Sequence, residues 1–190
     1  MQTIVTSELA LEPLVVAHAE AMFDVLSDAR IYRYLDYPPP SSVEHLRNVY
    51  AQLEARKSPD ESEIWLNWVV RPHGHPLVGY VQATVASNRS AYVAYIFASK
   101  HWGCGYAQKA MQPMLEHLAT EYSVDQSLAT VEVENRRSIR LLERLGFRPA
   151  GARESQGRDL TPTERLYARR ITKGTGLSWE QVGWHERGSH

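Results

Sequence analysis

A segment of thirteen residues in the middle of the chain, Ile96 to Gln108, restricts the possible folds more than any other part of the sequence. The stretch 91–98 is rich in tyrosine, valine, isoleucine and phenylalanine, which predicts a largely buried strand. Apolar residues then recur at the spacing of one helix face, at Ala107, Ala110, Met111, Met114, Leu115 and Leu118. Two glycines lie between these patterns, so the segment predicts a strand, a tight turn and a helix.

The two glycines, Gly103 and Gly105, allow a tight turn in which no Cβ blocks the approach of a ligand. Several backbone N–H groups can then point at one anion, and the dipole of the following helix favours its negative charge. We therefore expect a phosphate group to bind here. Dinucleotide-binding folds also place Gly-x-Gly before a helix, but their fingerprint has a third small residue where this chain has Gln108.

A second motif follows about thirty residues later, from Asn135 to Phe147. It predicts a short helix that Asn135 caps and Gly146 ends. Together the two segments resemble the GNAT superfamily of N-acetyltransferases. The first is similar to its acyl-CoA pyrophosphate loop, in the form Trp-Gly-x-Gly-Tyr-Ala of the branch that acetylates ribosomal protein N-termini. The second is similar to its Asn-x-x-Ser helix, and the resemblance extends from about Leu9 to Arg170.

The resemblance implies an α/β (α+β) fold: a mixed, mostly antiparallel, twisted sheet of six to seven strands with helices on both faces. Along the chain, the patterns predict strands at 9–14, 65–71, 77–87, 91–98, 128–134, 147–154 and 166–171, and helices at 16–26, 29–35, 43–55 and from 107 onward. We expect Pro113 to kink or break the long helix. Residues 1–171 would form a single N-acetyltransferase domain and 172–190 a tail, whose last four residues are typical of an expression-tag remnant.

Composition excludes several other classes of function. The length of 190 residues suits one domain, and 21 basic against 22 acidic residues leave almost no net charge, which argues against nucleic acid or an anionic membrane as a partner. The sequence lacks a signal-peptide pattern and an apolar run of membrane-spanning length. One cysteine makes no internal disulfide, so we expect a cytoplasmic protein.

The resemblance implies acetyl-CoA as co-substrate, no metal, and direct attack of a primary amine on the thioester in a ternary complex. It assigns cofactor binding to Ile96, Phe97, Ala98, Trp102, Gly103, Cys104, Gly105, Tyr106, Ala107, Asn135 and Ser138. In relatives two strands diverge to admit the pantetheine arm, and a backbone N–H near Ile96 to Ala98 polarises the thioester carbonyl. Asn135 would hydrogen-bond the pantetheine, cap its helix, or do both. His73 and His75 lack the third ligand of a metal site.

Three residues are candidates for the chemical step: Ser138, Tyr92 and Glu132. Ser138 would donate a proton to the departing thiolate, a task that many relatives give to a tyrosine where this chain has Leu142. Relatives often carry Glu-x-Gly-Tyr in the central strand, but here the segment from Tyr92 to Tyr95 replaces it and the usual carboxylate is missing. Glu132, Glu63 or a chain of waters would then act as the base.

The missing carboxylate affects which amine is expected as the acceptor, because a weakly basic amine needs less help to lose its proton. An α-amino group, with a pKa of about 7.7–8.0, is partly neutral at pH 7, whereas a lysine amine with a pKa of about 10.4 is not. The sequence therefore favours the N-terminal α-amine of a protein or peptide. In relatives the segment corresponding to 31–37 overhangs the acceptor pocket; here its three tyrosines, Arg33 and Asp36 would shape it.

Three alternatives to a protein or peptide N-acetyltransferase remain, two with another acceptor and one without catalysis. The first is a small amine, such as an antibiotic or a polyamine. The second is aminoacyl-tRNA, which requires Arg136, Arg137, Arg140 and Arg144 to gather on one face. The third is a catalytically silent acyl-CoA-binding module, suggested by the missing glutamate and tyrosine.

Overall fold

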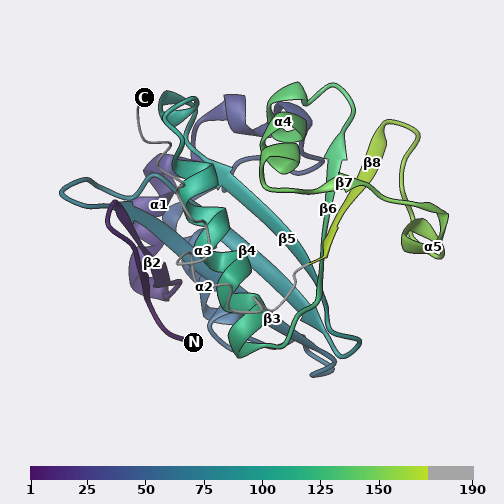
Figure 1. Ribbon diagram of the computed structural model, residues 1–190. Helices are drawn as coiled ribbons and strands as arrows, with labels where there is room; N and C mark the ends of the chain where they lie inside the picture. Colours follow the sequence, from purple (N-terminus) through teal and green to yellow (C-terminus); the bar gives the residue numbers. More distant parts are fainter. Residues whose placement is uncertain (171–190) are drawn as a thin grey trace, which may run out of the picture.

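The computed structural model describes residues 1–170, which form one mixed sheet with helices on both faces (Figure 1). The sheet has eight strands in the order β1-β2-β3-β4-β5-β6-β8-β7. In chain order they are β1 (Ile4–Val5), β2 (Leu9–Pro13), β3 (Glu63–Pro72), β4 (Gly79–Ala86), β5 (Ser90–Phe97), β6 (Gln126–Glu132), β7 (Arg148–Pro149) and β8 (Glu164–Arg170). All neighbours pair antiparallel except β5 and β6, which are parallel. The predicted fold class is confirmed, and the predicted tail lies outside the described residues.

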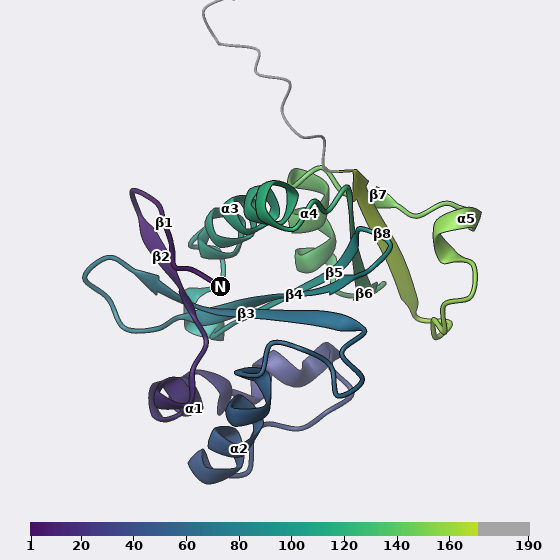
Figure 2. The ribbon, with the colours of Figure 1, turned by 90° about the horizontal axis from the view of Figure 1, so that it is seen from below.

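The helices cover the two faces of the sheet in separate groups (Figure 2). On one face lie the 3-10 helix η1 (Val16–His18), α1 (Ala19–Leu26), the 3-10 helix η2 (Ala29–Tyr34) and α2 (Val43–Leu53). On the other face lie α3 (Tyr106–Glu121) and α4 (Arg136–Arg144). None of the helices in residues 1–170 combines the length and the apolar character needed to cross a bilayer.

Two apolar clusters, one on each side of the sheet, hold these layers together. Met111, Met114, Leu115 and Leu118 of α3 are fully buried against the sheet, on the helix face that the sequence pattern predicted. On the opposite side, α1 and α2 pack over Val69 and Ile96. Full burial of one such aliphatic side chain stabilises the fold by about 1.5–3 kcal/mol, so both faces contribute strongly to stability.

The structure corrects two local predictions. The predicted strand 147–154 is only two residues long, because the chain turns at Gly151 into the short helix α5 (Ala152–Ser155). Glu154 accepts a hydrogen bond from the Gly151 N–H at 2.7 Å and pairs with Arg148, and these contacts favour the turn over continued pairing. Of the two outcomes expected at Pro113, a kink or a break, the break is wrong, because α3 continues through Pro113 to Glu121.

One further difference concerns a short strand. The strand β1 was not predicted, because a run of two residues carries no recognisable periodicity. Added to the predicted six or seven strands, β1 gives a sheet of eight.

Candidate active site

The loop between β5 and α3 has the conformation that its glycines predict. The chain leaves β5 through a short 3-10 helix, η3 (Ser99–His101), and reaches Gly103 with φ +85° and Gly105 with φ +81°. Both values lie in the left-handed region that favours glycine. Gly105 is the N-cap of α3 and provides no side chain to cap it. The helix N-terminus is therefore open to an external acceptor.

The backbone N–H groups of this loop divide into bonded and free ones. Trp102 donates to the Ser99 carbonyl at 3.1 Å, and Cys104 donates to the His101 carbonyl at 3.3 Å. Within residues 1–170, the N–H groups of Gly103, Gly105, Tyr106 and Ala107 have no acceptor. The first turn of α3 holds no acidic residue, and a Cβ built on Gly103 would meet no atom within 4 Å. The loop thus offers several donors and open space to an anion.

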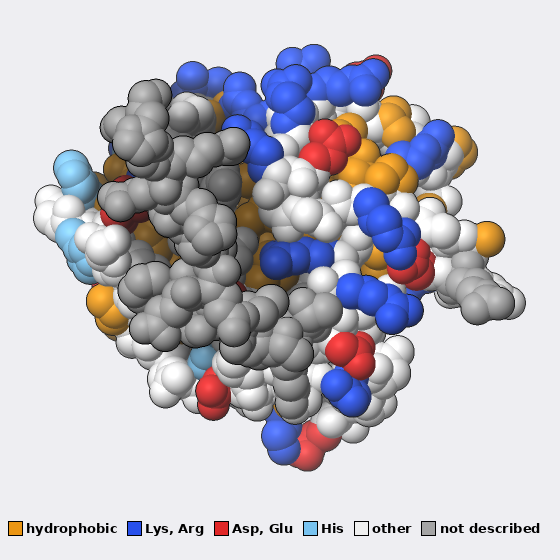
Figure 3. All heavy atoms as spheres, in the orientation of Figure 1, with side chains coloured by type: hydrophobic (Ala, Val, Ile, Leu, Met, Phe, Trp, Pro, Cys, Tyr) orange, Lys and Arg blue, Asp and Glu red, His pale blue; other side chains and the backbone are white. Residues whose placement is uncertain are grey.

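Side-chain charges next to the loop come mainly from α4. The Arg137 guanidinium lies 4.3 Å from the centroid of the Trp102 ring, so a cation–π contact joins the loop to α4. Figure 3 shows Lys and Arg side chains along the edge that contains α4 and this loop. Lys100, just before the loop, and Arg136, Arg137, Arg140 and Arg144 of α4 are exposed. Lys109 forms an ion pair with Glu8, as expected of a surface lysine.

The strands β5 and β6 pair only at their beginnings. The ladder joins Ser90 to Gln126, Ala91 to Ser127 and Tyr92 to Leu128. Beyond these pairs β5 continues to Phe97 and β6 to Glu132, and Figure 1 shows the two strands separating. One edge of β5 is therefore left without a partner strand in the described part of the chain. This is the divergence that the family resemblance implied.

The orientation of β5 selects one N–H group on that edge. Ala98 donates to the Val78 carbonyl at 3.0 Å, so its N–H points toward β4. Backbone groups of successive strand residues face alternate edges, so Ile96 also faces β4 while Phe97 faces the side of β6. The Phe97 carbonyl accepts a hydrogen bond from the Trp102 indole Nε1 at 2.8 Å. Of the three residues predicted to polarise a carbonyl, Phe97 has the suitably directed N–H.

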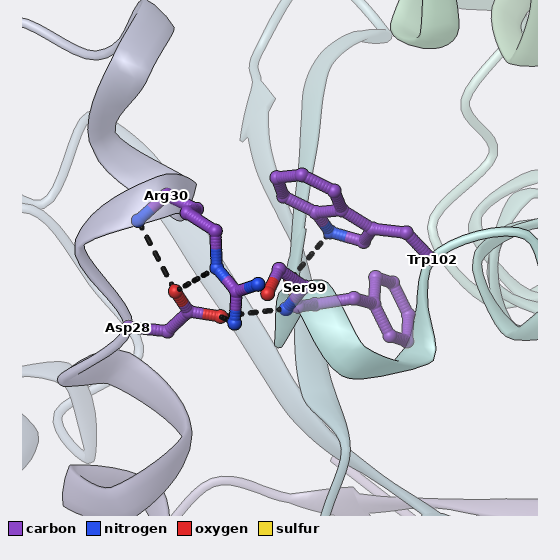
Figure 4. Close-up of polar contacts among 5 residues, drawn as sticks. Asp28, Arg30, Ser99 and Trp102 are labelled. Atoms are coloured by element: carbon purple, nitrogen blue, oxygen red, sulfur yellow. Dashed lines mark hydrogen bonds and ion pairs between the residues drawn. The ribbon is translucent and has the colours of Figure 1, made fainter.

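Asp28 lies between α1 and η2, on the opposite face of the sheet from α3, and its side chain holds the turn after β5 (Figure 4). Its carboxylate accepts hydrogen bonds from the backbone N–H of Ser99 at 3.0 Å and of Arg30 at 3.1 Å, and pairs with the Arg30 Nε at 3.0 Å. The contacts with Arg30 and Ser99 hold the pKa of Asp28 far below its usual value. Sequence reasoning missed this residue, because only a helix-capping role is visible locally.

The replacement Asp28→Asn is expected to destabilise the protein by about 1.5–3 kcal/mol at pH 7, the range for hydrogen bonds to a charged group. Because the pKa of Asp28 is lowered in the folded state, its contribution is present above the unfolded carboxyl pKa of about 3.9 and is lost as pH falls through the folded pKa. The Tm difference between wild type and variant should therefore shrink below about pH 4. Thermal melts measured over a series of pH values check this. Asp24→Asn, on the exposed face of α1, is the control. A Tm difference that stays constant with pH would contradict the prediction.

A tyrosine and a serine meet across the divergence of the strands. The Tyr95 hydroxyl of β5 lies 2.8 Å from Ser138 Oγ in the first turn of α4, and either atom can donate. Burial raises the pKa of Tyr95 to about 12, so its hydroxyl keeps its proton at neutral pH. Asn135 caps α4, and its Oδ1 accepts from the Ser138 N–H at 3.2 Å. Within residues 1–170, its amide nitrogen has no hydrogen-bond partner and can donate to a ligand.

Tyr92 does not join this pair. It lies three residues from Tyr95 on the same strand and therefore faces the other side of the sheet. There its hydroxyl contacts Arg158, whose guanidinium lies 4.8 Å from the ring centroid. The pattern that singled out Tyr92 contains Tyr95 as well, and the alternation of strand side chains would have identified Tyr95 as the residue on the α3 side.

Neither candidate base, Glu132 or Glu63, makes a hydrogen bond to the pair. Glu132 ends β6, half-buried, and its carboxylate makes no hydrogen bond within the described residues. Glu63 accepts a hydrogen bond from the Trp65 indole at 3.1 Å. His73 contacts the Thr6 carbonyl, and residues 1–170 contain no cluster of metal-binding side chains. Within residues 1–170, no carboxylate makes a hydrogen bond to the side chain of Tyr95 or Ser138.

A pocket of about 200 Å³ lies on the face covered by α1 and α2. Its walls come from η2, the segment after it, α2 and the strands β3, β4 and β5. The lining residues are Leu14, Leu26, Tyr32, Tyr37, Pro38, Pro40, His45, Leu46, Val49, Tyr50, Leu53, Asn67, Tyr80, Gln82 and Ile96. Of the segment 31–37, Tyr32 and Tyr37 line the pocket, whereas Arg33 stacks on Tyr34 with its guanidinium 5.2 Å from the ring centroid.

Comparison with known proteins establishes the family. Residues 8–148 match the family model described as the acetyltransferase (GNAT) domain. The chain belongs to this family and is an acyltransferase that transfers acetyl groups. It is similar to the uncharacterized N-acetyltransferase p20 of Bacillus licheniformis, with 24% identity over 80% of this chain and 85% of that protein.

Solved structures share the fold at lower identity. An acetyl transferase from Salmonella typhimurium, which modifies the N-terminal serine of a 50S ribosomal subunit protein, superimposes with a TM-score of 0.73 and 18% identity, over 89% of this chain and 98% of the other. A spermidine N-acetyltransferase from Vibrio cholerae, in complex with CoA and spermine, has a TM-score of 0.68 and 22% identity, over 87% and 96% of the two chains. Proteins of this fold thus include acetyltransferases of both proteins and small amines.

Proposed function

We propose that this protein transfers the acetyl group of acetyl-CoA to the N-terminal α-amine of a peptide or protein, by direct attack in a ternary complex. The observation that carries the proposal is the open edge of β5 ending at a helix N-terminus with free N–H groups. The loop from Gly103 to Ala107 would hold the pyrophosphate, as the space and donors there permit. The amide nitrogen of Asn135 would bind the pantetheine arm in the divergence of β5 and β6.

The chemical step needs a polarised carbonyl, a neutral amine and a proton for the leaving group. The Phe97 N–H faces the edge where the thioester would lie. The amine attacks the carbonyl carbon, the carbon–sulfur bond breaks, and the thiolate takes a proton from the hydroxyl pair of Tyr95 and Ser138. The acetylated nitrogen loses a proton to water, and the hydroxyl pair recovers its proton from solvent.

The α-amine is favoured because no carboxylate of the described residues hydrogen-bonds the hydroxyl pair, and the segment Tyr92 to Tyr95 lacks the glutamate that relatives often carry there. Without a strong base, the reaction depends on the fraction of acceptor that is already neutral, and this fraction is far larger for an α-amine than for a lysine side chain. A small primary amine is the second candidate, since the shared fold also serves spermidine acetylation in Vibrio cholerae.

A turnover screen tests the proposal. Purified protein is mixed with acetyl-CoA and a panel of peptides, polyamines and other small amines, and release of free thiol is followed. Peptides with free N-termini should turn over, whereas the same peptides with blocked N-termini should not. Binding of CoA without turnover of any amine would indicate a silent binding module. Salt-sensitive binding of tRNA would instead favour the aminoacyl-tRNA alternative, for which the exposed arginines of α4 supply a basic edge.

The exposed thiol of Cys104 reports directly on the proposed phosphate loop. Cys104 lies between the two glycines, so bound CoA should cover its sulfur and place negative charge beside it. Labelling by iodoacetamide, followed by mass spectrometry across a CoA titration, should slow at least about tenfold at saturation, the ratio expected when ligand occupies the site nine-tenths of the time or more. Rapid labelling that ignores saturating CoA would place the cofactor elsewhere.

A further inference from the structure

We propose that the pocket beneath α1 and α2 receives the first side chain of the acceptor, and that it selects an uncharged, apolar side chain with one hydrogen-bonding group, of which tyrosine is the model. This inference rests on the proposed function, because it describes the acceptor of the same reaction. It adds the chemical class that the family does not specify, and it is carried by four features of the pocket.

The first feature is position. Ile96 lines the pocket from one face of the sheet and directly precedes Phe97, whose N–H faces the open edge of β5. Gln82 and Tyr80 line it from the neighbouring strand β4. A group held in this pocket therefore lies against the strand segment where the acetyl group would be presented, on the side opposite α3.

The second feature is size. A volume of about 200 Å³ is below the 300–1,000 Å³ typical of pockets that enclose a drug-sized ligand. One side chain fits such a space, whereas a long extended molecule would protrude from it. The rings of Tyr32 and Tyr37 both line the pocket; their centroids are 5.9 Å apart and the rings are nearly perpendicular.

The third feature is charge. None of the lining residues is an acid, a lysine or an arginine, and His45 is exposed at the rim. Burial raises the pKa of Tyr32 to about 12 and also raises the pKa values of Tyr50 and Tyr80, so these hydroxyls stay neutral. A cationic group would lose its water here without a counter-ion. The attraction of tyrosine faces for a cation is smaller than that desolvation penalty.

The fourth feature is an unsatisfied hydroxyl. Tyr50 is 3% exposed and lines the pocket, yet its hydroxyl has no hydrogen-bond partner among the described residues. Buried polar groups without a partner destabilise a protein, and they are rare in folded proteins. An occupant with a hydroxyl or amide at the tip of an apolar side chain would provide the missing partner.

The test compares peptides that differ only in their first residue. We expect kcat/KM to be at least about tenfold higher for N-terminal tyrosine than for N-terminal lysine, and intermediate for phenylalanine. The variant Tyr50→Phe should remove the preference for tyrosine over phenylalanine, measured as the ratio of the two kcat/KM values. Tyr122→Phe, which removes a hydroxyl at the far end of α3, should keep the preference.

The outcomes separate this inference from the function on which it rests. Turnover of peptides with equal rates for all first residues, or a preference for lysine or spermidine, would overturn the pocket assignment and leave the acetyltransferase proposal intact. Retention of the tyrosine preference in Tyr50→Phe would also overturn the role of that hydroxyl. Calorimetry with N-acetyl-tyrosine amide and CoA gives a readout without turnover, and binding no tighter than that of N-acetyl-lysine amide would count against the pocket even in an inactive protein.

Discussion

Replacement of Gly105 by valine should weaken acetyl-CoA binding by at least about 100-fold, because loss of two hydrogen bonds to a charged group, each about 1.5–3 kcal/mol, corresponds to that factor. Gly105 has φ +81°, and a Cβ there would enter the space in front of the free N–H groups, where its nearest protein neighbour is Lys109 Cε at 3.7 Å. A β-branched side chain both disfavours this backbone conformation and occupies the place of the pyrophosphate. Calorimetric titration with acetyl-CoA measures the effect.

The control for this variant is Gly74→Val. Gly74, on the β3–β4 hairpin, has φ +74° and no atom within 4 Å of a Cβ, so the backbone strain is similar but no ligand is expected nearby. Both variants should therefore lose a similar amount of stability, whereas the control should keep its affinity for acetyl-CoA. Near wild-type affinity of Gly105→Val would remove the phosphate loop from the proposed site.

The second large effect is expected for the hydroxyl pair. Tyr95→Phe or Ser138→Ala should reduce kcat by about 100-fold, the lower end of the range for a positioned general acid, with little change in CoA affinity. Because the two hydroxyls lie 2.8 Å apart, the double variant should lose no more than the more affected single one. Steady-state kinetics with a peptide acceptor, together with CoA titrations, separates the two quantities.

Tyr92→Phe is the matched comparison on the same strand. It removes a hydroxyl that contacts Arg158 on the other face of the sheet, so it should leave kcat nearly unchanged. A loss of kcat in Tyr92→Phe but not in Tyr95→Phe would reverse the assignment. An unchanged kcat in all three variants would mean that water protonates the thiolate or that product release limits the rate.

Local patterns were enough to predict the parts of the fold that build the proposed phosphate loop. The apolar face of α3, the glycines before it and the Asn135 cap of α4 are all encoded within a few neighbouring residues, and each element appears where the pattern places it. The strand prediction failed at 147–154, where a side-chain hydrogen bond stabilises a turn instead. Glu154 accepts a hydrogen bond from the Gly151 N–H, and the chain turns into α5, so the strand predicted at 147–154 ends after two residues.

The site was less predictable than the fold because its contacts join distant parts of the chain. Asp28 and Ser99 are 71 residues apart in sequence, and Tyr95 and Ser138 are 43 apart. No local pattern records such a pairing. The role of Tyr95 follows only when the alternation of β5 is combined with the position of α4, and the free hydroxyl of Tyr50 appears only after the helices are packed on the sheet.

The short pairing of β5 with β6 also affects how this protein avoids aggregation. An unpaired strand edge is a template on which another chain can add a strand, and proteins usually keep such edges short or covered. Here the outermost strands of the sheet, β1 and β7, are two residues long. The longer open edge of β5 lies inside the sheet, between β5 and β6. The same backbone groups that would bind a cofactor are thus kept away from neighbouring molecules, so the catalytic opening does not become a site of intermolecular strand addition.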